Sequence, residues 1–507
     1  MLRAIVASAL GIATGIFGFT AGAGLTGSWL AASLIAAVAA GVVALLVHRR
    51  RVLTLDEAAC SRGLKVVSAV TTLVALVLLA RMAIFMVDPS QVRCSSMPTS
   101  QWEVEHSCLS AYFVAAEAAS SQANIYDNSL YNVPGSDPTG LRKARMIGPF
   151  KVDVFEYPPQ FLLLPRALLV LTPDFMDFRM LWFALNGGVL LLGLVVIAQF
   201  LGPANGTRAL LLSPLVWMSL PTTISTLQKG NVQIMVIAAS MLAMLLFERR
   251  RWWAGGALLA FVTVSKLYPG LLIVYLLVRR QWLAAAWTSA FAGAFSVLTL
   301  LAFGWGPYAA FLDHLPGLVG GEAFPAFRNP AATAINLSIP GLVFKLKLFG
   351  VPGMSFGAAK IVGWGYTLVA LAATVFAGVR IWRDSEKPLV WMAILILATL
   401  RSPFLPQTYG TIPPLWLLTL LAATWAPLTR APSMILFAWA ALNVYWPLDW
   451  PIDPRVLAIA NMVPQTVTVL LVVLALRRRQ ELPEQQHAAA RAFVPRLMLG
   501  IRRIYGA

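Results

Sequence analysis

Long apolar blocks, separated by short polar or basic segments, make up most of the chain. Most of the blocks are about 15–25 residues long, which is the length that an α-helix needs to cross roughly 30 Å of hydrocarbon. They lie at residues 4–22, 27–47, 64–86, 177–201, 208–227, 231–247, 252–278, 281–304, 356–382, 388–401, 412–426, 433–448 and 455–476. The pattern predicts an all-α polytopic membrane protein with about 11–14 transmembrane or re-entrant helices.

Composition and charge agree with this class. Of the 507 residues, 59% are hydrophobic and only 12% are charged, while the formal net charge is +18. The basic residues gather at the ends of apolar blocks, as in HRRR (48–51), ERRR (248–251) and RRR (477–479), a pattern typical of cytoplasmic loops. The charge therefore indicates membrane topology and contact with membrane lipids, and it argues against nucleic acid as a partner.

The same charge rule places two polar stretches on the outer side, a large first loop at about 87–158 and a second at about 305–350. A short apolar segment at 159–171 is expected to dip in from the outer face without crossing. Arginines flank the block at 252–278 on both sides, so this block is expected to turn back. Its apex is SKLYPG (265–270), where a lysine followed by Pro and Gly is typical of irregular backbone lining a wet cavity.

Polar residues and helix breakers meet at the predicted outer membrane boundary. A lysine, which acts as a point charge, and an arginine, which can bind two oxygens, would both suit a phosphate bound there. The alternative is that the lysine only reaches toward the interface and the arginine caps a helix end. The candidate phosphate-binding residues are Lys266, Arg401, Asn231 and Gln228.

The first outer loop also carries carboxylates and cysteines. Proton abstraction from an acceptor hydroxyl needs a carboxylate close to the reacting atom. Cys94 and Cys108 are candidates for a disulfide, which would close a loop of about 15 residues and contribute about 3 kcal/mol. No metal site or cofactor is expected, because the four histidines are scattered and form no i,i+4 pair.

Short motifs follow one another along the chain. They are CLSAYFVAAEA (108–118), IYD (125–127), FEYPPQFLLL (155–164), QKGNVQ (228–233), KLYP (266–269), NLS (336–338) and SPFLPQ (402–407). Their order and intervals resemble glycosyltransferase family 87 of the GT-C superfamily, which uses polyprenyl-phosphate sugars. The resemblance covers roughly residues 64–425 and is silent about the substrate.

The resemblance implies a GT-C-like bundle and an integral membrane glycosyltransferase. The donor would be a monosaccharide, often mannose, on a polyprenyl phosphate, and the sugar would pass with inversion to a lipid or glycan acceptor on the outer face. The motif positions imply substrate-binding roles for Tyr112, Asp127, Tyr157, Tyr268, Asn336 and Gln407.

The chain departs from the family pattern at two positions. Cys108 stands where the family has an aspartate, four residues before Tyr112, that is its expected general base. Gln407 falls near a position that is often histidine. Because a neutral thiol cannot replace a carboxylate base, a neighbouring acid is expected to serve, and the candidates are Glu105, Asp88 and Glu156.

The resulting prediction divides the chain into three parts. They are an N-terminal transmembrane hairpin with its cytoplasmic loop (1–63), a catalytic transmembrane domain (64–476) and a basic cytoplasmic tail (477–507). The active site is expected on the periplasmic side of a bacterial-type inner (plasma) membrane. Two alternatives stay open: a transporter or flippase of lipid-linked saccharides, and a non-catalytic relative that binds lipid-linked sugar.

Overall fold

Helices form almost all of the regular structure. The computed structural model describes residues 2–49, 53–135 and 143–477, and it is 74% helical with almost no strand. The predicted all-α polytopic membrane protein is therefore confirmed. Residues 478–507 of the predicted basic tail lie outside the described residues.

The elements follow the chain in four groups. The first three helices are α1 (Leu2–Thr26), α2 (Trp29–His48) and α3 (Arg62–Val87). The first outer loop holds η1 (Val92–Cys94), α4 (Gln101–Glu105), β1 (His106–Ser107), α5 (Cys108–Ala118), η2 (Asn128–Leu130), β2 (Met146–Ile147) and β3 (Phe150–Val152). The central part holds η3 (Pro159–Leu162), α6 (Leu163–Leu171), α7 (Phe175–Phe200), α8 (Pro203–Leu212), α9 (Pro214–Trp217), η4 (Leu220–Ile224), α10 (Ser225–Lys229), α11 (Gln233–Glu248), α12 (Trp252–Lys266), α13 (Gly270–Val278) and α14 (Trp282–Phe303). The last part holds α15 (Gly306–Gly320), η5 (Pro325–Arg328), α16 (Pro330–Ala334), α17 (Gly341–Leu348), α18 (Phe356–Val379), α19 (Lys387–Thr399), α20 (Gln407–Gly410), α21 (Ile412–Thr424), α22 (Ala426–Thr429), α23 (Pro432–Leu442) and α24 (Pro454–Arg477).

Only some of these helices are long enough to cross a membrane on their own. Among the described residues, seven helices pass by length and composition: α1, α2, α3, α7, α14, α18 and α24. Several other predicted spans, including α11, α19 and α23, form shorter apolar helices of 10–17 residues. The predicted count of about 11–14 therefore includes helices that are too short to span the hydrocarbon at 1.5 Å per residue.

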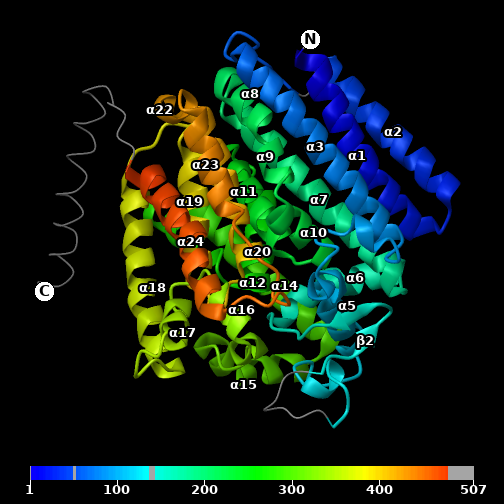
Figure 1. Cartoon of the computed structure of the whole chain (residues 1–507), viewed down its shortest axis with the longest axis vertical. Coiled ribbons are helices and arrows are strands. Elements are labelled where there is room, and N and C mark those ends of the chain that lie inside the picture. The colour runs from blue at the N-terminus through cyan, green and yellow to red at the C-terminus, as the bar shows by residue number, and fades with distance from the viewer. Residues whose placement is uncertain (1, 50–52, 136–142, 478–507) are drawn as a thin grey trace, which may run out of the picture.

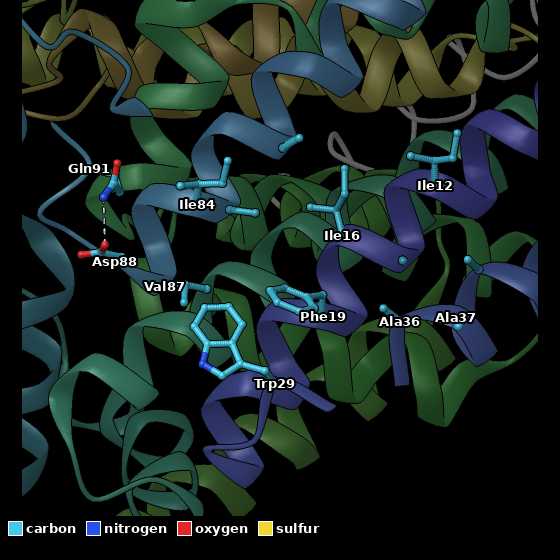
Figure 2. A pocket seen from close by; sticks show the side chains of 14 residues that line it. Ile12, Ile16, Phe19, Trp29, Ala36, Ala37, Ile84, Val87, Asp88 and Gln91 are labelled. Carbon is cyan, nitrogen blue, oxygen red and sulfur yellow. Dashed lines mark hydrogen bonds between the residues drawn. The ribbon is translucent and has the colours of Figure 1, made fainter. Parts of the chain in front are cut away.

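The N-terminal hairpin is held together by small residues. A Cβ at Gly11 would lie 2.9 Å from the backbone oxygen of Ala40, and a Cβ at Gly22 would lie 2.8 Å from Cα of Ala32. Such close backbone approach is typical of helix pairs in membranes. A cavity of about 740 Å³ opens between α1, α2 and α3, with an almost wholly apolar lining that ends at Asp88 and Gln91 (Figure 2).

The block at 252–278 turns back as predicted. α12 ends at Leu267, whose φ of 49° interrupts the helix. At the far end of α13, Arg279 donates a 2.8 Å hydrogen bond to the backbone oxygen of Arg380. Seven residues further on, Lys387 pairs at 2.6 Å with Glu248, the last residue of α11, and α12 begins four residues later. The start of α12 and the end of α13 therefore lie at the same end of the bundle.

The predicted span at 208–227 is not one helix. It is divided into α8 and α9, a π-helical turn η4 and α10, with a bend of 65° between the two halves. Pro214 begins the second segment and Pro221 is the second residue of the third, and a proline lacks the N–H that a continuous helix would need. The bend directs α10 and the following Gly230 toward the first outer loop.

The two polar loops lie at the same end of the molecule, the lower end in Figure 1. In the first loop, β1 pairs in parallel with β3, which also pairs with β2 in an antiparallel arrangement. Residues 106–107 lie opposite residues 151–152 in this small sheet. The pairing brings the segment before α5 next to the segment before the YPP motif.

Candidate active site

A cavity of about 1040 Å³ lies where the two outer loops meet the breaks in the membrane helices. Its lining comes from the first loop, the α10–α11 junction, the turn between α12 and α13, the second loop and the segment after α19. Seven of the predicted catalytic and binding residues line it: Lys266, Arg401, Asn231, Tyr112, Tyr157, Tyr268 and Glu156. The cavity therefore brings together residues that are up to about 290 positions apart in the sequence.

Lys266 and Arg401 supply positive charge to the cavity without a carboxylate partner. Nζ of Lys266 lies 5.2 Å from the ring centre of Tyr157, and Nε of Arg401 donates a 2.6 Å hydrogen bond to Thr367. Neither side chain forms an ion pair with a carboxylate of the described residues, although Glu156 lines the same cavity and its charge acts on Lys266. Cations without a direct ion-pair partner at membrane depth are costly unless an anion or water meets them.

Aromatic and amide groups form the wall next to Lys266. Tyr112 of α5 donates a 3.1 Å hydrogen bond to the hydroxyl of Tyr157. The hydroxyl of Tyr268 and the side-chain amide of Gln233 also face this cavity, and neither has a hydrogen-bond partner in the part of the chain that the structure describes. Buried polar groups without partners are expected to bind ligand or water.

Gly230 fixes the junction between α10 and α11. It adopts φ 67°, and its backbone oxygen accepts a 2.8 Å hydrogen bond from the indole of Trp182. A Cβ at this position would lie 2.7 Å from Cβ of Leu109, which follows Cys108 in α5. A glycine is required here both for the left-handed backbone and for the contact with α5.

The variant Gly230→Ala should lower the free energy of unfolding by about 1–3 kcal/mol, because it combines backbone strain with overpacking against α5. Unfolding of the purified protein in detergent measures the change. Gly188→Ala in α7 is the matched control, since a Cβ there meets nothing within 4 Å. Equal stability of the two variants would contradict the assigned role of Gly230.

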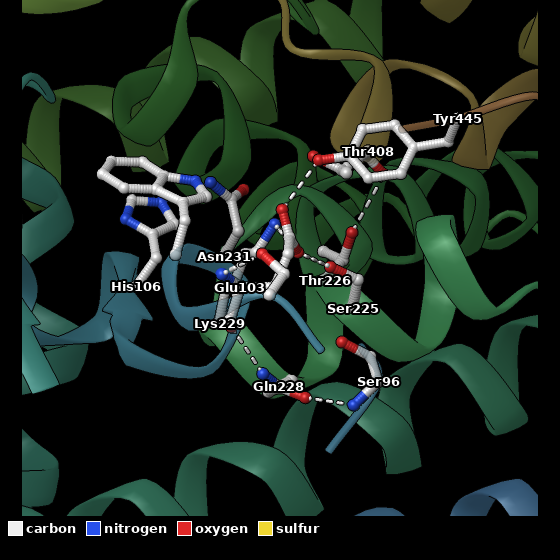
Figure 3. Close-up of polar contacts among 12 residues, drawn as sticks. Ser96, Glu103, His106, Ser225, Thr226, Gln228, Lys229, Asn231, Thr408 and Tyr445 are labelled. Atoms are coloured by element: carbon white, nitrogen blue, oxygen red, sulfur yellow. Dashed lines mark hydrogen bonds and ion pairs between the residues drawn. The ribbon is translucent and has the colours of Figure 1, made fainter. Parts of the chain in front are cut away.

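A buried ion pair lies in the wall of the cavity, and Figure 3 shows its contacts. Nζ of Lys229 lies 2.7 Å from a carboxylate oxygen of Glu103, and both side chains are at most 3% exposed. Tyr445 and Ser225 donate further hydrogen bonds to this carboxylate, at 2.7 and 3.1 Å. Burial raises the pKa of Glu103, but Lys229 and these interactions outweigh it, so the pKa lies below its usual value.

Three potential metal ligands lie close together at the N-terminus of α5. Nε2 of His106 lies 3.6 Å from Sγ of Cys108 and 3.8 Å from a carboxylate oxygen of Asp153. Burial raises the pKa of Cys108 to about 12, so the free thiol is neutral at physiological pH and cannot act as a general base. All three residues line the cavity.

The predicted disulfide is not formed in the structure. Cys94 and Cys108 are both free cysteines. Cys94 lies in η1 directly after α3, whereas Cys108 begins α5. Sγ of Cys108 contacts the hydroxyl of Tyr409 at 3.0 Å and accepts a hydrogen bond from Asn231 at 3.4 Å.

Two of the three predicted base candidates do not line the cavity. Asp88 accepts hydrogen bonds from Ser90 and Gln91 at the end of the N-terminal cavity in Figure 2. Glu105 pairs at 2.8 Å with Lys151, which lines the large cavity, but Glu105 itself does not. Glu156 alone lines the large cavity.

Four predicted binding residues have structural contacts instead. Gln228 bridges the first loop, accepting from the backbone of Ser96 at 2.6 Å and donating to that of Glu103 at 2.7 Å. Asp127 caps η2. The remaining two join the second loop to the segments around α20 and α24: Asn336 accepts from the backbone N–H of Leu405, and Gln407 accepts from Asn461. None of the four lines the large cavity.

Several residues of the cavity were not predicted from the sequence. Glu103, His106, Lys229, Asp153, Tyr409 and Tyr445 all line it. Lys229 lies inside the QKGN motif, between the predicted phosphate-binding residues Gln228 and Asn231. Its place in the motif was therefore a usable signal that it belongs to the site. The others come from segments that only the fold brings together.

A comparison with known families covers the central part of this site. Residues 155–405 match the sequence model of glycosyltransferase family 87. Over this half of the chain, the protein belongs to glycosyltransferase family 87. No curated protein and no solved structure matches the chain.

The family 87 match includes the YPP motif, the α10–α11 junction, Lys266 and Arg401. It identifies the protein as a glycosyltransferase. The match begins after α5, so the assignment of Cys108 to the position of the family's aspartate stays a prediction.

Proposed function

We propose that this family 87 protein transfers a monosaccharide from a polyprenyl-phosphate donor to a lipid or glycan acceptor, with inversion. The observation that carries the proposal is the pair of cations, Lys266 and Arg401, that line the cavity without a carboxylate partner among the described residues. A phosphate at membrane depth supplies the missing negative charge. Lysine and arginine together suit its tetrahedral oxygens.

The same cations favour the chemical step. When the bond between the sugar and the phosphate breaks, negative charge grows on the leaving phosphate. Groups fixed in advance around that charge stabilise the transition state more than the ground state. Lys266 is the last residue of α12 and directly precedes the turn at Leu267, which makes it such a fixed group.

The polar wall of the cavity suits a sugar. Tyr268 and Gln233 offer a hydroxyl and an amide with no partner among the described residues, and sugar hydroxyls both donate and accept hydrogen bonds. Tyr157 and Tyr112 add aromatic surface beside Lys266. Mannose is the sugar that we propose first, on the resemblance stated above.

The position of the cavity supports an extracytoplasmic reaction in a bacterial-type inner membrane. Both outer loops contribute to its lining, whereas the arginine-flanked ends of α12 and α13 lie at the opposite end of these helices. Nucleotide sugars are cytoplasmic, so a lipid-linked donor is the form of activated sugar available on the outer face. No organic cofactor is needed for this transfer.

The test is a transfer assay with the full chain in lipid nanodiscs. The protein receives a panel of labelled polyprenyl-phosphate monosaccharides together with a membrane lipid and glycan extract. We expect one donor to give a labelled product that is absent without protein. Movement of the intact donor across a vesicle membrane without product would instead support a flippase, and binding without either would support a non-catalytic relative.

A further inference from the structure

The cluster around Cys108 is formed by the pairing of two short strands. β1 and β3 run in parallel with Ser107 opposite Val152, so the residues that follow each strand, Cys108 and Asp153, emerge side by side. Ser110 secures this arrangement, because its hydroxyl accepts a 2.9 Å hydrogen bond from the backbone N–H of Asp153. His106 precedes the pair on β1.

The three side chains converge on one point. Nε2 of His106, Sγ of Cys108 and a carboxylate oxygen of Asp153 all lie within 4.8 Å of one another. A tetrahedral zinc ion, with bonds of about 2.3 Å to sulfur and about 2.0–2.1 Å to nitrogen and oxygen, holds its ligand atoms roughly 3.3–3.6 Å apart. The separations of 3.6 and 3.8 Å from Nε2 lie within a few tenths of an ångström of these values, and the cluster as a whole has to contract from its limit of 4.8 Å.

Several groups converge on one ring nitrogen of His106. Nε2 faces Asp153, Cys108 and Tyr409, at 3.8, 3.6 and 3.4 Å. A carboxylate oxygen, a sulfur and an imidazole nitrogen gathered in this way fit a shared ion.

Neighbouring groups are placed to orient these ligands. The ring of His106 stacks on Trp102, with ring centres 4.8 Å apart. Tyr409 and Asn231 contact Sγ of Cys108 and can donate to a thiolate. Hydrogen bonds of this kind around a metal ligand fix its orientation.

We propose that His106, Cys108 and Asp153 bind one divalent transition-metal ion, with the fourth coordination position open to the cavity. The donor set of one nitrogen, one thiolate sulfur and one carboxylate oxygen favours Zn²⁺ over Mg²⁺ or Ca²⁺, which prefer oxygen ligands. A thiolate and a carboxylate together balance the charge of the ion. Three protein ligands and one open position are typical of catalytic zinc sites.

The role of the ion rests on the proposed function. An acceptor hydroxyl bound at the open position loses its proton to water in the cavity, because the ion stabilises the resulting alkoxide. The alkoxide oxygen forms the new bond to the anomeric carbon of the sugar. The bond from that carbon to the donor phosphate breaks, and its electron pair leaves with the phosphate. The ion thereby replaces the carboxylate base that the family pattern expects at Cys108.

The test measures metal binding directly. The full chain in detergent is stripped with a chelator, re-equilibrated with buffered Zn²⁺ and analysed for bound metal by mass spectrometry. It is then loaded with Co²⁺, which gives a thiolate-to-metal charge-transfer band when sulfur is a ligand. We expect one ion per chain, and loss of the band in Cys108→Ser but not in the control Cys94→Ser from the same loop.

The variant His106→Ala should weaken metal affinity by more than the roughly 10–100-fold that is typical of removing an outer partner. Absence of stoichiometric metal, or a charge-transfer band that survives Cys108→Ser, would overturn the proposal. Thermal unfolding of each variant shows whether it is folded, and Cys108→Asp offers a second variant that keeps a metal-binding side chain. Metal binding without sugar transfer would refute the proposed function alone, whereas transfer by a metal-free chain would refute the role of the ion in the reaction and leave the proposed function standing.

Discussion

Replacing Lys266 with alanine should reduce the rate of sugar transfer by about 10²–10³-fold, the loss that is typical when one preorganised charge at a leaving group is removed. The reason is that Lys266 lines the cavity with no carboxylate partner among the described residues, so its charge is available to the donor phosphate. The measurement is the initial rate of product formation at saturating donor. Thermal unfolding of the same preparation checks that the variant is folded.

Lys347→Ala is the matched control for this experiment. Lys347 is also a lysine near the outer end of the molecule, but it is exposed on α17 and does not line the cavity. Its replacement should leave the rate unchanged. A folded Lys266→Ala variant that transfers sugar as fast as this control would remove the basis of the phosphate site.

The variant Glu103→Gln should lower the free energy of unfolding by about 3–5 kcal/mol, because it leaves the charge of Lys229 buried without its partner. The two side chains are 2.7 Å apart and at most 3% exposed, so water cannot compensate for the lost carboxylate. Chemical unfolding of the purified protein in detergent measures the change.

A surface ion pair supplies the comparison for Glu103. Glu322 and Lys360 are 2.8 Å apart, but their side chains are 40% and 44% exposed. Glu322→Gln should therefore cost less than about 1 kcal/mol. Equal losses in the two variants would mean that Glu103 and Lys229 are hydrated in the folded protein.

The sequence was sufficient for features in which one short segment carries the whole signal. Lys266 lies in an apolar block that is flanked by arginines and broken by Pro269 and Gly270, and the structure shows the predicted return. Arg401 likewise follows a helix end beside Pro403. A charge next to a helix breaker at the membrane boundary has few physical explanations, and this limited the possible interpretations of Lys266 and Arg401.

The sequence was insufficient where a polar residue could bind either ligand or backbone. Asn336 and Gln407 stand in motifs beside helix ends, but their amides join the second loop to the segments around α20 and α24. Composition does not separate the two uses, since an amide offers the same donors and acceptors to a sugar and to a peptide group. For the acids of the first loop, spacing along the sequence did not show which side chains would line the cavity.

The cluster of His106, Cys108 and Asp153 shows a different limit. Two of its residues are neighbours in sequence, but the third joins them through a parallel strand pair of two residues. Strands that short give no periodic pattern to identify. The absence of a histidine pair therefore led to the expectation that the chain has no metal site.

The bond between Tyr445 and Glu103 has a consequence for the biogenesis of the protein. These residues are separated by 342 positions, so ribosomes must complete most of the chain before the carboxylate of Glu103 receives its last donor. Until then, the emerging protein has an incomplete cavity wall, because Tyr445 and Leu448 belong to that wall. Truncation anywhere before Tyr445 is thus expected to give a chain that inserts its early helices but is recognised by membrane proteases as unfinished.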